Sequence, residues 1–135
     1  MSEPEWLNSA IILDIHAEQL ALFGGADGVR DIMLLESALE RPLNKFAYGE
    51  TRLAMLVAAH AFGIARNHPF VDGNKRTVLA CIFVFLGLNK MEFVPSREEA
   101  TASILSMAAG EISEDDFANW IERYISNPSN APPET

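Results

Sequence analysis

The chain has 135 residues, 49% of them hydrophobic, and a formal net charge of −9. A chain of this length is expected to form one domain that buries about two-thirds of its unfolded surface, and its acidic balance argues against direct nucleic-acid binding, which needs clustered Lys and Arg. Its longest apolar run, 78–88, is shorter than the roughly 20 residues of a membrane span, and its N-terminus lacks a signal-peptide pattern, so we predict a cytoplasmic protein without a membrane segment.

Helical patterns dominate the first part of the chain. Ser9 is a candidate N-cap for a helix that runs to about Leu22 and ends at two glycines. Asp31 is a candidate N-cap for a second helix. This helix is predicted to stop before Pro42, because proline lacks the N–H group that a helix interior needs. Residues 43–50 are therefore interpreted as a connector.

Two strongly apolar helices are predicted in the middle of the chain. The first covers about 51–67, and the second, 78–88, is apolar on every face, which is typical of a helix buried in a core. Cys81 lies in this second helix and is interpreted as a small buried hydrophobic residue. As the one cysteine of the chain, it excludes an internal disulfide and a cysteine metal cluster.

Two histidines fall on apolar helical stretches outside the central motif. We interpret His16 and His60 as buried structural residues. They lie on segments separate from the third histidine, His68, without the spacing of metal ligands, which argues against a histidine metal site.

The C-terminal part is also predicted to be helical. Ser96, with an acidic residue three positions later, begins a helix that ends near Gly110, and Ser113 caps a last helix with acids in its first turn. No stretch shows the sustained alternation of a half-buried strand. The sequence therefore predicts an all-α domain over residues 1–126, followed by a Pro-rich tail at 127–135 that is expected to be disordered.

The stretch between the two apolar helices carries the most specific chemistry. Residues 68–78 read His-Pro-Phe-Val-Asp-Gly-Asn-Lys-Arg-Thr-Val and open onto the N-terminus of the apolar helix. The first backbone N–H groups of a helix lack partners and carry the positive end of its dipole, so they favour anions. Gly73, Asn74 and Lys75 supply such donors, and the stretch predicts a phosphate-binding loop.

The charged side chains of this stretch indicate what the loop binds. Lys75 and Arg76 add two cations, and the fork of Arg76 matches phosphate geometry. Asp72 is a hard oxygen ligand suited to Mg²⁺, which binds few protein groups and several phosphate oxygens. His68, at the start of the loop, is a candidate general base. Each residue alone has an ordinary structural explanation, and their joint spacing predicts a site for a polyphosphate and Mg²⁺.

The loop resembles that of the Fic superfamily, which reads His-Pro-Phe, two variable residues, Gly-Asn-Gly-Arg, two further residues and a second Arg. Within it the pattern is closest to the Doc (death-on-curing) branch, whose loop reads Asp-Ala-Asn-Lys-Arg-Thr-Ala. Here Lys75 replaces the second glycine, Leu79 stands at the second Arg, and Gly73 replaces the first alanine of the Doc pattern. The resemblance extends over most of the chain, at 15–16, 23–25, 30–42 and 110–113.

This resemblance implies a compact Fic/Doc-type helical bundle with the active-site loop at the N-terminus of a buried central helix. It also implies a protein kinase, since Lys75 and Leu79 remove the provisions for AMP transfer and ATP then binds reversed, with its γ-phosphate facing the target hydroxyl. The implied target is a threonine of elongation factor Tu, whose modification blocks translation. By the same resemblance His68 is the base, Asp72 the Mg²⁺ ligand, and the phosphate-binding residues are Gly73, Asn74, Lys75 and Arg76.

The resemblance further implies two protein contacts. A flap beside the active site receives the target chain, and its position here corresponds to Lys45, Phe46 and Tyr48. Many Fic proteins inhibit themselves through a motif of Ser or Thr, three residues, Glu, and Gly or Asn, which does not occur in this sequence. The resemblance therefore implies inhibition in trans by a Phd-like antitoxin, as part of a toxin-antitoxin system.

Two alternatives remain open at this point. One is a Fic-type protein adenylyltransferase, favoured by Gly73 and disfavoured by Lys75 and Leu79. The other is a catalytically silent domain that keeps the fold and uses its groove to bind proteins.

Overall fold

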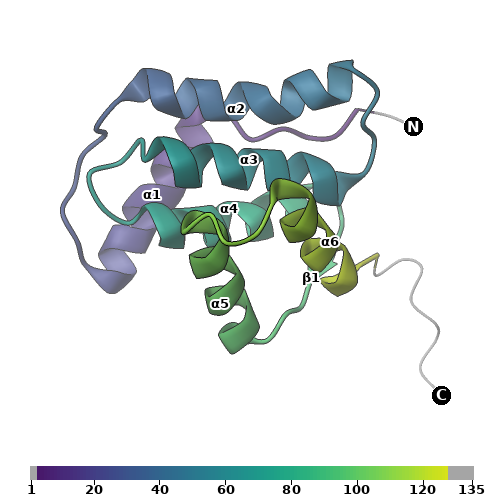
Figure 1. The fold of residues 1–135 in the computed structure, drawn as a ribbon. Coiled ribbons are helices and arrows are strands. Elements are labelled where there is room, and N and C mark those ends of the chain that lie inside the picture. Colours follow the sequence, from purple (N-terminus) through teal and green to yellow (C-terminus); the bar gives the residue numbers. More distant parts are fainter. Residues whose placement is uncertain (1–2, 128–135) are drawn as a thin grey trace.

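The computed structural model describes residues 3–127, which form a helical bundle with one short antiparallel strand pair (Figure 1). Its helices are α1 (Ser9–Phe23), α2 (Ile32–Ala47), α3 (Leu53–Asn67), α4 (Asn74–Leu88), α5 (Arg97–Ala108) and α6 (Glu114–Tyr124), and its strands are β1 (Glu92–Phe93) and β2 (Ile125–Ser126). The predicted all-α class is confirmed. The predicted tail lies outside the described residues from 128 onward. Within residues 3–127, no helix has both the length and the apolar content that crossing a membrane requires.

Helix α3 is the central element of the core. Every residue of the range 56–65 is buried, and α2, α4 and α6 pack around it (Figure 1). Helices α2 and α3 run antiparallel, as the contact of Ala38 with Gly63 and the hydrogen bond from Arg41 Nε to the Ala59 carbonyl oxygen (3.1 Å) indicate. A Cβ atom on Gly63 would lie 2.8 Å from both Cα and Cβ of Ala38, so the two backbones approach closely.

The second helix does not stop before Pro42, and this prediction was wrong. Helix α2 continues to Ala47 with Pro42 inside it. Pro42 is buried on the face of α2 that also buries Leu35 and Ala38. Burying this face against α3 outweighs the missing N–H of one proline, as tertiary packing often overrides local propensity. Part of the predicted connector is therefore helical.

The predicted N-caps agree with the structure except at α1. Asp31, Ser96 and Ser113 are the N-caps of α2, α5 and α6, and each accepts a backbone N–H from the first turn of its helix. In α1 the cap is Asn8, whose Oδ1 accepts the N–H of Ile11 at 2.9 Å, and not Ser9. The one-residue error is small because both residue types are good N-caps.

Helix α4 begins at Asn74, four residues earlier than the apolar run alone predicts. It packs against α3, with α1 and α5 also in contact with it. The short segment 68–73 therefore leads directly into α4, whose first residues are polar residues of the motif. This arrangement brings the C-terminal end of α3 and the N-terminal end of α4 together at one edge of the bundle (Figure 1).

Candidate active site

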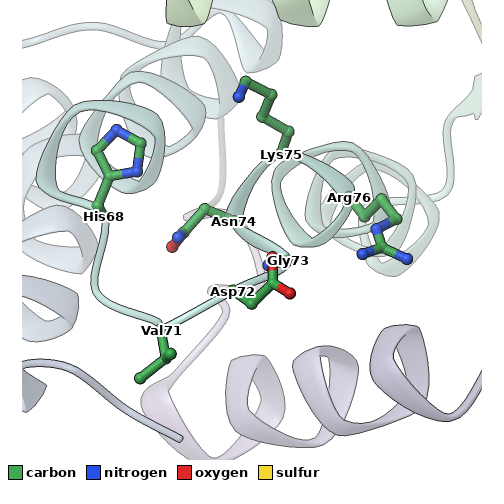
Figure 2. Close-up of a pocket in the computed structure, with 7 residues that line it drawn as sticks. All are labelled: His68, Val71, Asp72, Gly73, Asn74, Lys75 and Arg76. Atoms are coloured by element: carbon green, nitrogen blue, oxygen red, sulfur yellow. The ribbon is translucent and has the colours of Figure 1, made fainter. Parts of the chain in front are cut away.

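The motif residues line one hollow at the junction of α3 and α4. Its volume is about 360 Å³. Figure 2 shows the side chains of His68 and Lys75 pointing to the same side of the loop, Val71 to the opposite side, and Arg76 away from His68. The hollow is lined by His68, Val71, Asp72, Gly73, Asn74, Lys75 and Arg76. The structure therefore gathers the predicted loop residues around a single space.

His68 terminates α3 in a left-handed conformation, with φ 48° and ψ 60°. A side chain with a Cβ is disfavoured there by about 1 kcal/mol. The backbone is held by Arg30, whose Nε donates to the His68 carbonyl oxygen at 2.7 Å and whose Nη2 donates to that of Asn67 at 2.6 Å. A cation at the C-terminus of α3 also complements the helix dipole. The His68 side chain is exposed and opens onto the hollow.

Asp72 is held as a carboxylate by backbone donors. Its Oδ2 accepts the N–H of Ala26 at 3.2 Å, and its Oδ1 accepts the N–H of Gly73 at 2.8 Å. These two bonds are the main reason why the pKa of Asp72 lies below its usual value; desolvation acts in the opposite direction, and the positive charge of Arg76 adds to the lowering. The group is therefore ionised at neutral pH and able to hold a cation.

The backbone beside Asp72 requires a glycine. Gly25 has φ +127°, and a Cβ added there would lie 2.8 Å from Asp72 Oδ2. The positive φ strains any other residue at this position, and a Cβ there would also force the Asp72 carboxylate to shift. The segment 24–31 therefore touches the candidate metal ligand directly.

The first turn of α4 forms the anion-binding part of the site. Gly73 is the N-cap in a left-handed conformation, with φ 78° and ψ 16°, and helix geometry leaves the next three N–H groups without an intrahelical partner. The Asn74 side chain is used inside the loop, since its Oδ1 accepts the N–H of Phe70 at 3.1 Å and its Nδ2 donates to the Phe70 carbonyl at 2.9 Å. Lys75 is exposed, and the Arg76 guanidinium lies 5.4 Å from the ring centroid of Phe23.

The loop rests on a buried pair of rings. Phe70 is 1% exposed and stacks on His16, with 3.8 Å between ring centroids and 6° between planes. His16 Nε2 lies 2.8 Å from the Asp72 carbonyl oxygen. Burial of His16 and His60 is confirmed, at 3% and 2% exposure. His16 is more than a core residue, however, because its polar atom contacts the loop.

The three residues predicted for the flap lie elsewhere. Lys45 Nζ forms an ion pair with Glu114 Oε2 of α6 at 2.7 Å. The Phe46 ring packs edge-on against the Trp6 ring, with 5.7 Å between the ring centroids. Tyr48 is 93% exposed just after α2. Because α2 and α3 are antiparallel, these residues lie at the end of the pair opposite the loop (Figure 1).

The chain beside the loop is instead the segment 24–31, between α1 and α2. Val29 forms an antiparallel bridge with Phe70, the N–H of Val71 donates to the Gly28 carbonyl at 3.0 Å, and the N–H of Arg30 donates to that of Pro69 at 2.7 Å. Sequence reasoning included the glycines and the Arg-Asp pair of this segment in a resemblance and read the glycines and Asp31 as helix boundaries, but it assigned none of them a role at the loop. This segment pairs with the loop through backbone atoms, so its side chains show no periodic hydrophobic pattern in the sequence.

Two further hollows open beside the loop on the side of α5. One, of about 440 Å³, is bounded by His68, Lys75 and the C-terminal end of α5. The other, of about 230 Å³, is an apolar slot between α4 and α5 that includes Leu79, Ile104 and Leu105. Lys75 lines both of these hollows and the loop hollow. A ligand held at the first turn of α4 can therefore extend toward α5.

Comparisons with known proteins point to one family. A model of the Fic/DOC family matches residues 6–86, which include α1, the loop and most of α4. The chain is similar to "Protein kinase doc" of Escherichia phage P1, 32% identical over 113 residues that cover 83% of this chain and 89% of that protein. It is also similar to "Toxin Doc" of Mycolicibacterium smegmatis (strain ATCC 700084 / mc(2)155), 44% identical over 73 residues that cover 52% of this chain and 55% of that protein.

Proposed function

The chain belongs to the Fic/Doc family, and from this premise we propose that it is a Doc-like toxin that transfers the γ-phosphate of ATP to a threonine hydroxyl of a target protein. The observation that carries the proposal is the shared hollow. An exposed histidine, an ionised aspartate and a helix N-terminus with two cations open onto one space. Phosphoryl transfer needs these parts for positioning and charge stabilisation.

Each loop residue has a role in the proposed reaction. His68 accepts the proton of the attacking hydroxyl. Asp72 would hold Mg²⁺, which needs few protein carboxylates and would supply positive charge beside the phosphates. The N–H groups after Gly73, together with Lys75 and Arg76, bind the phosphates. Because the Asn74 amide is bonded to Phe70, its contribution to phosphate binding comes from its backbone N–H.

The surroundings of Leu79 favour the kinase over AMP transfer. Leu79 stands where Fic proteins have a second Arg for the γ-phosphate, and here it lines the apolar slot between α4 and α5. Apart from Lys75 and Arg76 the lining of this slot is mostly apolar, which suits the flat face of a nucleobase. Lys75 also stands where the Fic loop has a glycine, which in that loop leaves room for a phosphate. Both features support ATP bound with its γ-phosphate at the loop, and the relative from phage P1 is named a protein kinase.

The target and the inhibitor are proteins. Elongation factor Tu is the proposed substrate, and a Phd-like antitoxin is the proposed inhibitor in trans. The relative from M. smegmatis is named a toxin, which supports an antitoxin partner. We assign the role of the flap to the segment 24–31 in place of residues 45–48, because of these two segments the former lies along the loop. Its backbone pairing with Phe70 and Val71 supports this assignment, because an extended segment beside the loop can pair with another extended chain.

The test is transfer from γ-labelled and, separately, α-labelled ATP with Mg²⁺ to purified elongation factor Tu, with mass spectrometry of the product. The expected result is γ-label on a threonine, lost in His68→Ala and retained in Glu122→Gln, an exposed control on α6. Label from the α-position would establish AMP transfer instead. No transfer, together with no rise in Tm on adding ATP and Mg²⁺, would favour a silent binding domain.

A further inference from the structure

Two side chains outside the motif bind the backbone of the residues that carry the chemistry. His16 comes from α1 and contacts the Asp72 carbonyl, and Arg30 comes from the segment before α2 and contacts the His68 carbonyl. We propose that His16 and Arg30 are positioning residues, which fix the candidate Mg²⁺ ligand and the candidate base relative to each other. This inference rests on the proposed function of the loop.

The His16 contact has a defined chemistry. A carbonyl oxygen accepts hydrogen bonds and cannot donate them, so the 2.8 Å contact requires the hydrogen of His16 on Nε2. The ring cannot turn away easily, because it is 3% exposed and stacked on Phe70. His16 therefore acts on the loop twice, through a hydrogen bond to Asp72 and through the stack with Phe70.

Arg30 acts at the other end of the loop. Its two donors hold the last carbonyls of α3, at Asn67 and His68, within 2.7 Å. This pins a left-handed His68 that would otherwise relax toward ordinary helix-end conformations. The backbone N–H of Arg30 also donates to the Pro69 carbonyl at 2.7 Å. The position of the His68 ring relative to the hollow is thus coupled to Arg30.

These contacts affect catalysis because phosphoryl transfer depends on positioning. A displacement of about 1 Å in a catalytic group can cost on the order of 100-fold in rate. Replacing a residue that only stabilises the fold would lower Tm and leave the rate of the folded enzyme unchanged. The two roles can therefore be separated by variants that keep either the hydrogen bond or the packing.

At position 16 the two functions of the ring are separable. His16→Phe keeps a ring to stack on Phe70 and removes the donor, whereas His16→Gln keeps an N–H donor of similar reach and removes the ring. We expect His16→Phe to lower kcat at least about tenfold, with the KM for ATP changed less than about threefold. His16→Gln should recover kcat to within about threefold of the wild type even where its Tm is lower. Equal losses in both variants, or losses that follow Tm, would overturn the role of His16.

At position 30 the comparison is between Arg30→Lys and Arg30→Met. Lysine keeps a cationic donor but lacks the planar fork that reaches both carbonyls, and methionine has no donor. We expect kcat to fall in the order wild type, Arg30→Lys, Arg30→Met, with the last at least about tenfold below wild type. Arg97→Met on α5 removes an exposed arginine away from the loop and should leave kcat unchanged. If both position-30 variants keep full kcat, Arg30 does not position His68.

A readout without activity separates this inference from the proposed function. The N–H of Val71 donates to Gly28 and that of Gly73 to the Asp72 carboxylate, so their hydrogen exchange reports on loop order. His16→Phe should accelerate exchange at these amides at least about fivefold while leaving α3 unchanged. If the wild type transfers no phosphate, the proposed function fails, and unchanged exchange in His16→Phe would then overturn the positioning role independently.

Discussion

The loop between α3 and α4 and the α2–α3 helix pair are held together by different means. The loop is fixed by single hydrogen bonds from distant segments, such as His16 to Asp72 and Arg30 to His68. The helix pair is fixed by close packing of small residues, with Gly63 against Ala38. Directional bonds determine where a few atoms lie and contribute little to global stability, whereas close packing contributes to the stability of the whole domain. Changes in the loop should therefore affect rate, and changes in the helix pair should affect stability.

The largest effect is expected at His68. Removing a general base lowers transfer by about 10²- to 10⁴-fold, so His68→Ala and His68→Gly should both lose that much kcat in the label-transfer assay. Their stabilities should differ, because His68 is left-handed and only glycine adopts this conformation without strain. We expect the free energy of unfolding of His68→Gly to exceed that of His68→Ala by about 1 kcal/mol in urea titrations.

Equal stability of the two variants would mean that the loop relaxes around residue 68 and stores no strain there. Activity retained in either variant would remove His68 from the role of base. The two measurements test the two halves of the comparison separately.

Sequence alone predicted the features that depend on neighbours in the chain. The helices, three of their caps and the grouping of the loop residues follow from local patterns, since a nine-residue stretch cannot spread its side chains far apart. Features that depend on tertiary contact were missed or wrong. Pro42 lies inside a helix because α3 covers it.

The contacts that shape the loop come from remote segments. His16 acts over 56 positions of sequence, and Arg30 over 38. No spacing rule brings such residues to a loop, although the resemblance to the Doc branch pointed to both of their segments. The predicted flap at 45–48 lies at the far end of the α2–α3 pair, and this placement follows from the antiparallel packing, which sequence patterns do not specify.

The second-largest effect concerns pH and the buried face of α3. Burial lowers the pKa of His60 from 6.5 to about 4, and neither ring nitrogen has a hydrogen-bond partner among the described residues. The unfolded chain binds the proton at higher pH than the folded one, so stability is complete above pH 6.5 and is lost as pH falls toward 4. At about 1.4 kcal/mol per pKa unit the loss amounts to roughly 3 kcal/mol.

The measurement is the free energy of unfolding in urea at several pH values between 7.5 and 4.5, for the wild type and for His60→Leu. The carboxylates titrate in both proteins, so the difference between them isolates His60. The difference should change by about 1 kcal/mol between pH 6.5 and 5.5. A difference that stays constant over this range would show that His60 is not protonated on unfolding.

The smallest effects are expected from two glycines in helices, with opposite signs. Gly63→Ala puts a Cβ 2.8 Å from Ala38 and should force α2 and α3 apart, at a cost of about 1–3 kcal/mol. Gly87→Ala in α4 meets no atom within 4 Å and should gain about 0.5–1 kcal/mol from helix propensity alone. Neither residue lines the loop hollow, so kcat at 25 °C should be unchanged in both variants. Tm and urea titrations would measure the changes in stability, and the transfer assay would measure kcat. A stabilising Gly63→Ala would mean that the helix pair has room to spare, and the contrast between packed pair and bonded loop would then lose its basis.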